Sequence, residues 1–368
     1  MKIGLEMELW VVDEQGRLCD GHGLTEQHDR FEPEFVGPLV EVRTEPHTTT
    51  ASLREDFQRT LQLAIDIADE AGKHLVPLGT PLSAAEAPAK GTRGELFETI
   101  YGDGVRSAKN CAGTHFHFEK DEVCRQLNVL TALDPALALL SSSPYYCGDL
   151  DCRSSRARAY RRKCGPEFER FCDLWPYVDT VDEWTERVHD AYVAFEELAS
   201  QRDVSPERLG EHFSPNDTVL NPVRLRHEQP TVEWRAPDSA LPSEVLALAR
   251  DTRRLVEQTS WKSVERGETG VTADRIGIPE FENLASLSDE AIVRGLDSDR
   301  VRSYLEGLGF DPDEYDPVAE SMRTPEPLTE ADARDIRLTQ AERLRKDVAT
   351  LTNGPDVDSA AALSEVSR

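Results

Sequence analysis

Four segments of the chain alternate strictly between apolar and ionisable residues. They are IGLEMELWVV at residues 3–12, LVEVR at 39–43, AGTHFHFE at 112–119 and TVEWRAPD at 231–238. Because successive side chains of a β-strand point to opposite faces of a sheet, this period of two predicts four strands, each with one apolar and one ionisable face. The run HLVPLGT, which begins at residue 74, is also typical of a strand.

Longer segments repeat their apolar positions with the period of a helix. We expect helices over residues 51–71, 121–141, 181–200 and 243–258. Gly72 is suited to ending the first helix, and Pro135 predicts a kink or break in the second. Residues 141–163 contain Pro, Gly and Ser, become strongly basic and are predicted to form a loop.

The irregular alternation of strands and helices favours an α+β fold, in which an antiparallel sheet carries helices on one face. From about residue 266 the strand signals fade, and acidic helical segments with Pro-containing joints follow. We therefore predict one domain over residues 1–265 and an acidic helical extension over 266–368. The last dozen residues are expected to be disordered.

The ionisable faces of the four predicted strands carry an unusual set of side chains. They hold Glu6 and Glu8, then Glu41 and Arg43, then His115, His117 and Glu119, and finally Glu233 and Arg235. A solvated sheet face would mix Thr, Lys, Ser and Gln, and any one of these pairs alone would fit such a face. The general acidity of the chain explains some of the glutamates but not the histidines, so we interpret the four faces as a joint site.

Carboxylates that gather on one surface repel one another unless a cation neutralises them. Oxygen-rich glutamate sites suit Mg²⁺ or Mn²⁺, and Mg²⁺ binds through a few carboxylates together with substrate phosphates. Arginines on the same face suit phosphate oxygens, so the set favours phosphoryl transfer. The sequence has no G-x-x-x-x-G-K-[ST] motif and no G-x-G-x-x-G motif after a strand, so metals and side chains would have to hold ATP.

The net charge of −28, from 70 acidic and 42 basic residues, is spread along the whole chain. A highly acidic surface favours solubility in concentrated salt, and we expect a halophilic protein. The same charge argues against nucleic acid and anionic membrane as partners, because phosphate binding needs a basic surface. Small-molecule substrates and a homo-oligomer are both compatible with it.

The N-terminal residues MKIGLEMELW include charges and lack the apolar core of a signal peptide, which predicts a cytoplasmic location. The seven cysteines contain no C-x-x-C pair. The spacing of the four that lie between residues 147 and 172 matches no common zinc pattern, so reduced thiols are expected.

The motifs GLEMEL (4–9), LVEVRTEP (39–46), GTHFHF (113–118) and TVEWRAPD (231–238) resemble, in order and spacing, the signature of glutamate–cysteine ligases and the related YbdK-type carboxylate–amine ligases. The segments KHLVPLGTPLS (73–83) and SSSPYY (141–146) resemble connecting segments of that family, and the match covers about residues 1–260. This family has a glutamine-synthetase-like fold, in which an antiparallel sheet curls into a funnel with helices on its outer face. The resemblance makes residues 1–265 the catalytic domain.

The resemblance also implies roles for six residues of the joint site. Glu6, Glu8 and Glu233 would bind Mg²⁺, Glu41 would bind metal or the incoming amine, and His115 would contact nucleotide or metal. Arg235 would neutralise the transferred γ-phosphate of ATP. The substrate's γ-carboxylate would be phosphorylated, and the amine would attack the acyl phosphate, with glutamate and cysteine as the leading pair.

The basic segment that follows SSSPYY has the character of a contact for a substrate carboxylate or phosphate, and Arg156 and Arg161 are its candidates for cofactor binding. The alternative is a solvated basic loop.

Two other functions stay open on the sequence. One is a metal-dependent amide hydrolase, in which His115 and His117 with carboxylates bind Zn²⁺ and activate water. The other is a catalytically silent relative that binds a metabolite.

Overall fold

The structure is a computed structural model, and it describes residues 1–34, 36–84, 91–102, 107, 109–162, 165, 168–227, 229–322 and 327–351. Its largest sheet consists of β1 (Ile3–Asp13), β2 (Phe31–Pro33), β3 (Leu39–Arg43), β4 (Lys73–Val76), β5 (Thr114–Glu119), β8 (Val223–Leu225) and β9 (Thr231–Trp234). The strands run in the order β2-β3-β1-β5-β9-β8, β4 also pairs with β1, and every pairing is antiparallel. The four alternating segments are therefore strands of one sheet, as the sequence predicted.

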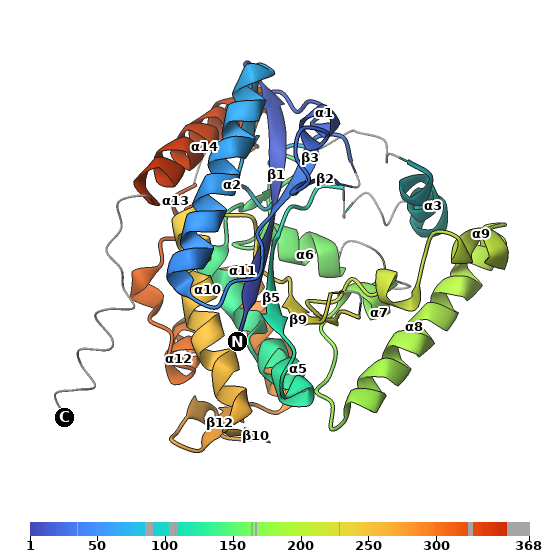
Figure 1. The fold of residues 1–368 in the computed structure, drawn as a ribbon, viewed down its shortest axis with the longest axis vertical. Coiled ribbons are helices and arrows are strands. Elements are labelled where there is room, and N and C mark those ends of the chain that lie inside the picture. The colour runs from blue at the N-terminus through green and yellow to red at the C-terminus, as the bar shows by residue number, and fades with distance from the viewer. Residues whose placement is uncertain are drawn as a thin grey trace.

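The apolar faces of these strands pack on long helices. Leu5, Phe116 and Val232 share one buried core with Phe57 of α2 (Thr50–Glu70) and Val245 of α10 (Pro242–Glu257). Burying one such side chain contributes about 1.5–3 kcal/mol, which fixes which face of the sheet turns inward. Figure 1 shows α2 and α10 on one side of β1, and α3 (Gly91–Tyr101) and α8 (Val181–Gln201) on the other.

Local signals set most helix boundaries. Thr49 caps α2 by accepting a hydrogen bond from the backbone N–H of Ser52 at 3.1 Å, and Gly72, with φ +66°, follows the end of the helix. The predicted break at Pro135 is confirmed, because α5 (Val123–Ala132) ends there and the 3₁₀ helix η2 (Asp134–Leu140) follows. The prediction of a loop over 141–163 is wrong in part, because it contains the helix α6 (Ser155–Arg162).

The region after residue 266 is mostly helical, as expected, but it also completes a second sheet. This sheet consists of β10 (Ser263–Arg266), β11 (Gly270–Val271) and β12 (Arg275–Ile278). The helices are α11 (Phe281–Arg294), α12 (Asp299–Gly307), α13 (Val318–Ser321) and α14 (Glu330–Thr350). Val301 and Leu344 of this region belong to the same core as Leu5 of β1. The domain boundary at 265 falls within β10 and stays a prediction, and residues 352–368 lie outside the described residues.

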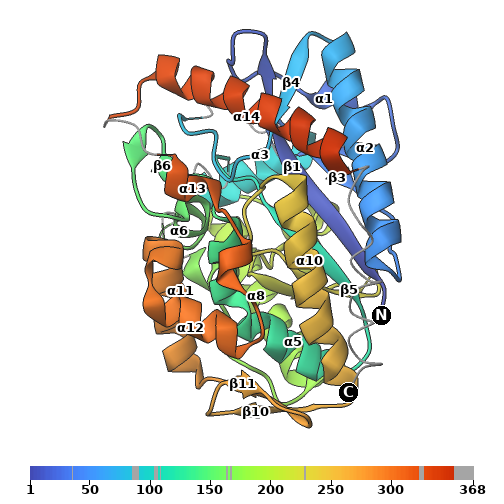
Figure 2. The same ribbon diagram turned by 90° about the vertical axis from the view of Figure 1, so that its left-hand side faces the viewer.

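Figure 2 shows α14 crossing the molecule next to α2 and β4. Trp10 and Val12, near the end of β1, are buried in a second core together with Ala333 and Ala341 of α14. The shorter elements are α1 (His22–Thr25), β6 (Tyr145–Tyr146), β7 (Asp149–Leu150), α7 (Glu169–Cys172), α9 (Pro206–Gly210), η4 (Pro215–Asp217), η5 (Gln258–Ser260), η6 (Gly295–Asp297) and η7 (Pro312–Glu314).

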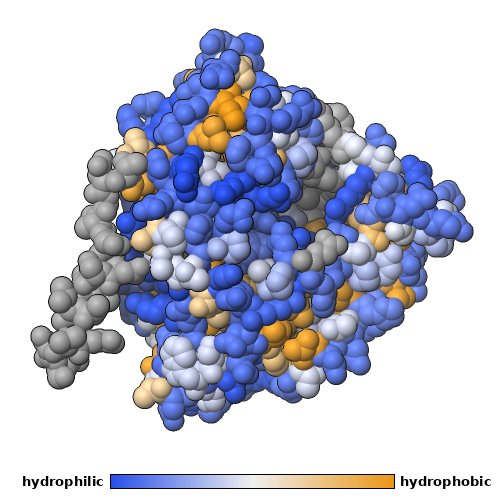
Figure 3. All heavy atoms as spheres, in the orientation of Figure 1, coloured by the Kyte–Doolittle hydropathy of each residue, from blue (hydrophilic) through white to orange (hydrophobic). Residues whose placement is uncertain are grey.

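The face of the molecule in Figure 3 is mainly hydrophilic, with small separate apolar patches. Within the described part of the chain, no single helix has the length and apolar composition needed to cross a membrane; the bent pair α5 and η2 meets those criteria only when its two parts are joined. No disulfide joins the cysteines that the structure describes, which are Cys19, Cys111, Cys124, Cys147, Cys152 and Cys172.

Candidate functional site

The register of the large sheet places the predicted site residues opposite one another. The facing pairs are Glu8 with Glu41, Glu6 with His115, and His117 with Glu233. Because these partners lie on adjacent strands and share a face, their side chains are neighbours. The same row continues at both edges of the sheet, to Glu32 on β2 and Arg224 on β8.

These side chains line a cavity of about 440 Å³. Its lining includes the predicted residues Glu6, Glu8, Glu41, His115, Arg156, Glu233 and Arg235. The opposite wall includes Arg93, Phe97 and Tyr101 of α3 and Tyr160 of α6. The ionisable face of the sheet is therefore the floor of a concave site and is largely shielded from bulk water.

His115 lies at the centre of the carboxylates and is 4% exposed. Its Nδ1 atom lies 3.3 Å from Glu6 Oε2 and 3.6 Å from Glu233 Oε1, and its Nε2 atom lies 3.6 Å from Glu8 Oε1. Burial and the positive charge of Arg235 lower the pKa of His115, although the neighbouring carboxylates act in the opposite direction. The ring therefore favours the neutral form, in which a nitrogen can bind a metal ion.

Glu6 is held ionised by the two histidines of β5. Burial alone would raise its pKa, but His117, whose Nε2 atom lies 3.0 Å from Glu6 Oε2, and His115 together hold the pKa of Glu6 well below its usual value. Burial opposes protonation of His117, yet Glu6 and Glu233 raise its pKa. The ionised form of Glu6 is thus favoured in the middle of the sheet.

At the acidic end of the cavity, which Glu8, Glu32, Glu34 and Glu41 form, the pKa of Glu41 is raised instead of lowered. Burial raises the pKa of Glu41 well above its usual value, and the charges of Glu6, Glu34, Glu8 and Glu32 raise it further. The protonated form of Glu41 is therefore favoured beside these carboxylates. A bound cation would relieve this repulsion.

The basic end of the cavity is built around Glu233, which is 1% exposed. Its carboxylate lies 3.6 Å from Arg235, 3.5 Å from Arg226 and 4.0 Å from Arg224. Burial would raise its pKa, but Arg235 and Arg224 lower the pKa of Glu233 to about 2. Burial and the charge of Arg235 lower the pKa of Arg224 to about 9. Three arginines around one carboxylate leave an excess of positive charge that suits an anionic ligand.

The donors of this cavity fit divalent cations. Three groups each bring one ligand atom per residue to within 4.8 Å of one another; they are Glu6–Glu41–His115, Glu6–His117–Glu233 and Glu8–Glu34–Glu41. Neither carboxylate oxygen of Glu233 receives a hydrogen bond from the described residues, although both are buried. Carboxylate oxygens are the ligands that Mg²⁺ and Mn²⁺ prefer, and buried oxygens without donors need a cation or water.

The two candidate arginines of α6 have separate environments. Arg156 lines the cavity, but it donates hydrogen bonds to the backbone carbonyls of Ala236 and Arg235 at 2.9 and 3.3 Å. Arg161 donates to both carboxylate oxygens of Asp134, at 2.7 and 2.5 Å, and both side chains are buried. Arg161 is not among the residues that line the cavity. The cofactor contact of Arg161 stays a prediction, and in the structure its guanidinium group joins α6 to η2.

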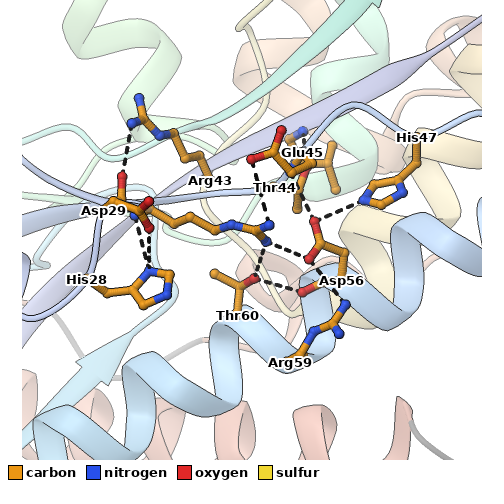
Figure 4. Close-up of polar contacts among 11 residues, drawn as sticks. His28, Asp29, Arg43, Thr44, Glu45, His47, Asp56, Arg59 and Thr60 are labelled. Carbon is orange, nitrogen blue, oxygen red and sulfur yellow. Dashed lines mark hydrogen bonds and ion pairs between the residues drawn. The ribbon is translucent and has the colours of Figure 1, made fainter.

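The segment after β3, which belongs to the LVEVRTEP motif, is anchored to α2 by Asp56 (Figure 4). The Asp56 carboxylate accepts hydrogen bonds from Arg30 Nη1 at 2.5 Å and from the backbone N–H of Glu45 at 3.0 Å, and it lies 2.9 Å from His47 Nε2. Burial alone would raise the pKa of Asp56, but these contacts lower it. They fix the end of the strand that carries Glu41.

The sequence analysis missed several residues of the cavity. Arg224 and Arg226 alternate with Val223 and Leu225 in the run VRLR, a signal of the same kind as those used for the other strands. Glu34 follows Glu32 at a spacing of two in the run FEPEF, whereas Arg93 lies in α3, where no comparable pattern marks it.

The fold and this cavity define an α+β protein with a carboxylate-lined sheet. The model of glutamate–cysteine ligase family 2 matches residues 2–265, and the chain belongs to that family. Two proteins named as glutamate–cysteine ligase 2, from Clavibacter michiganensis subsp. michiganensis and Clavibacter sepedonicus, are each 30% identical to it over 166 residues. These matches cover 40% of this chain and 42% of each relative, so less than half of either length is aligned.

Two solved structures share the fold. The glutamate–cysteine ligase of Francisella tularensis, solved in complex with AMP, has a TM-score of 0.60 and 14% identity, and the match covers 99% of this chain and 94% of that one. A bifunctional glutathione synthetase from Pasteurella multocida has a TM-score of 0.59 and 16% identity, with 94% of this chain and 52% of that one covered.

Proposed function

We propose that this protein is an ATP- and Mg²⁺-dependent carboxylate–amine ligase, with glutamate and cysteine as its substrates and γ-glutamylcysteine as its product. The observation that carries the proposal is the convergence of Glu6, Glu8, Glu41, His115, Glu233 and Arg235 in one cavity of a member of this family. The AMP bound to the ligase of Francisella tularensis supports a nucleotide as ligand.

Each end of the cavity has a part in the proposed reaction. Glu6, Glu8 and Glu233 would hold Mg²⁺, which neutralises phosphate charge when it is bound, and Glu41 would bind metal or the incoming amine. Arg235, with Arg224 and Arg226 beside it, would stabilise the γ-phosphate as it passes from ATP to the substrate's γ-carboxylate. The amine nitrogen then attacks the acyl carbon, phosphate leaves, and the nitrogen loses a proton.

The proposal extends to the setting of the reaction. We take residues 1–265 as the catalytic domain and expect the antiparallel sheet to curl into a funnel around the cavity. Small-molecule substrates, a cytoplasmic location and the absence of nucleic-acid and membrane partners belong to the same proposal.

The test is an ADP-release assay in concentrated KCl with ATP, Mg²⁺, glutamate and cysteine, with omission of each amino acid as the control. We expect ADP release that needs glutamate and is accelerated by cysteine. ATP binding without turnover on any pool of amino acids would contradict the ligase and favour a silent relative. Amide cleavage that EDTA abolishes, without ADP release, would favour the hydrolase.

A further inference from the structure

In the wall of the cavity, a buried arginine of α6 supports the segment that follows β9. Arg156 is 5% exposed, and its Nη1 and Nη2 atoms donate hydrogen bonds to the carbonyls of Ala236 and Arg235. A planar guanidinium group can reach two adjacent carbonyls at once, which an ammonium group cannot do with the same geometry. Arg156 therefore fixes the backbone from which the Arg235 side chain reaches into the cavity.

The same guanidinium group also packs on the strand segment that holds Glu8. A Cβ atom on Gly113 would overlap Arg156 Nη2 and Cζ, so the close approach of these groups requires glycine. The backbone N–H of Gly113 donates to Glu8 Oε2 at 2.5 Å, and its carbonyl accepts from the Glu8 N–H at 2.9 Å. Arg156 thus touches the supports of both the acidic and the basic end of the cavity.

Asp238 lies in the same segment as Arg235 and pairs with Gly113 in an isolated β-bridge; burial raises its pKa to about 6, although the charge of Arg156 acts in the opposite direction. It is 1% exposed, and its Oδ2 atom accepts hydrogen bonds from the backbone N–H and the hydroxyl of Ser142 at 3.0 and 3.3 Å. The carboxylate lies where a Cβ atom of Gly79 would be, and the Gly79 N–H donates to the Ser142 hydroxyl at 2.7 Å. Asp238 is therefore held from two sides by the segments 79–80 and 141–143.

We propose that Arg156 and Asp238 are positioning residues that set the separation between Glu8 and Arg235. The proposal rests on the proposed function, in which Glu8 binds a cation and Arg235 a phosphate. A shift of about 1 Å at either residue would separate the metal from the phosphate that it must neutralise, and displacements of this size cost about 100-fold in rate. This role differs from the direct cofactor contact that the sequence suggested for Arg156.

The test compares Arg156→Lys and Asp238→Asn with Arg158→Lys. Arg158 lies on the same helix, pairs with Asp151 at 3.5 Å and does not line the cavity, so it is a matched control. Mn²⁺ affinity is measured by electron paramagnetic resonance, and kcat and the KM for ATP are measured by ADP release. We expect the first two variants to lose about 10- to 100-fold in Mn²⁺ affinity and in kcat, with the KM for ATP changed by less than about twofold, and the control to match the wild type.

A large rise in the KM for ATP with unchanged Mn²⁺ affinity would overturn the proposal in favour of direct substrate contact, and so would wild-type behaviour of both variants. Thermal melting in KCl shows whether each variant is folded. If Arg156→Lys does not fold, Asp238→Asn decides the matter, because it keeps the shape of the carboxylate. Failure of the ligase function would appear as a wild type without ADP release, whereas the Mn²⁺ titration still tests the positioning role.

Discussion

Glu6 is central to the proposed metal site, because it belongs to two of the three candidate ligand groups and its Oε2 atom lies 3.3 Å from His115 Nδ1 and 3.0 Å from His117 Nε2. We predict that Glu6→Gln lowers ADP release by more than about 100-fold, since an amide is a poor ligand for Mg²⁺ and leaves His117 without its partner. The fold should persist, because the amide keeps the shape of the carboxylate. Circular dichroism and melting check the fold, and turnover is measured beside it.

Glu119→Gln is the control for this prediction. Glu119 lies at the end of the same alternating face of β5, but it is exposed and does not line the cavity. Its variant should turn over like the wild type. Normal activity of Glu6→Gln would contradict the assignment of Glu6 to the metal site.

Glu41 gives the site a predicted dependence on pH. Its pKa is raised well above the usual 4.5. At pH values between 4.5 and this raised pKa, Glu41 therefore still carries a proton that a cation must displace. Mn²⁺ affinity should therefore increase as the pH rises through this raised pKa, and binding should release a proton. Titrations of Mn²⁺ at a series of pH values measure this slope.

The variant Glu41→Gln should bind Mn²⁺ more weakly and with a flatter pH profile. Some dependence should persist, because the pKa of His117 is also raised and its protonation also opposes the cation. An unchanged slope in Glu41→Gln would show that Glu41 is not the group that competes with the metal.

At the residue scale, the sequence predicted the centre of the site better than its walls. Glu6, Glu8, His115 and Glu233 could be found because the period of two places them on one face of each strand. The ion pair of Arg161 could not be predicted, because its partner Asp134 is 27 residues away and local pattern says nothing about such pairs.

At the scale of elements, alternation predicted the strands that have one buried apolar face and one ionisable face. It failed for β11, which has two residues and is too short to show a period, and for β12, whose run RIGI carries only one ionisable residue. It also failed for α6, because residues 141–163 were predicted to form a loop, whereas Ser155–Arg162 are helical and Arg156 and Arg161 are buried. Burial of a charged residue depends on tertiary partners, which the local sequence does not reveal.

The helix α14 contributes a prediction about stability. Its Arg337 is fully buried and donates hydrogen bonds to the carbonyls of Pro81 and Gly16, each at 2.9 Å, and to the hydroxyl of Ser83. Arg337→Met removes these hydrogen bonds and leaves the buried Gly16 carbonyl without its guanidinium donor, so the free energy of unfolding should fall by about 2–4 kcal/mol. Urea denaturation at constant KCl concentration measures the change.

The matched control is Arg334→Met, one turn earlier on α14. Arg334 pairs with Glu330 at 3.1 Å on the surface, and its loss should change the free energy of unfolding by less than about 0.5 kcal/mol. Equal midpoints for the two variants would contradict the role of Arg337 in fastening α14 to the sheet domain.

At the scale of the whole molecule, a net charge of −28 creates repulsion that salt must screen. The screening length falls from about 10 Å at 0.1 M salt to about 3 Å at 1 M, so the melting temperature should rise with KCl over this range. Differential scanning calorimetry across KCl concentrations measures it, with sucrose at equal osmolality as a control that does not screen charge. A melting temperature that is constant or falls with KCl would contradict the halophilic interpretation.

The candidate site forms only when the whole chain folds. Its residues come from β1, β3, β5 and β9, which are far apart in the sequence and adjacent in the sheet. The core between the sheet and the helices α2 and α10 fixes the register that brings them together.

The most direct measurement is anomalous scattering from crystals soaked in Mn²⁺ and a non-hydrolysable ATP analogue. We predict manganese peaks between the side chains of Glu6, Glu8, Glu41, His115 and Glu233, with the phosphates toward Arg235. Saturating Mn²⁺ that gives no peak in this cavity, or peaks only elsewhere on the molecule, would contradict the account.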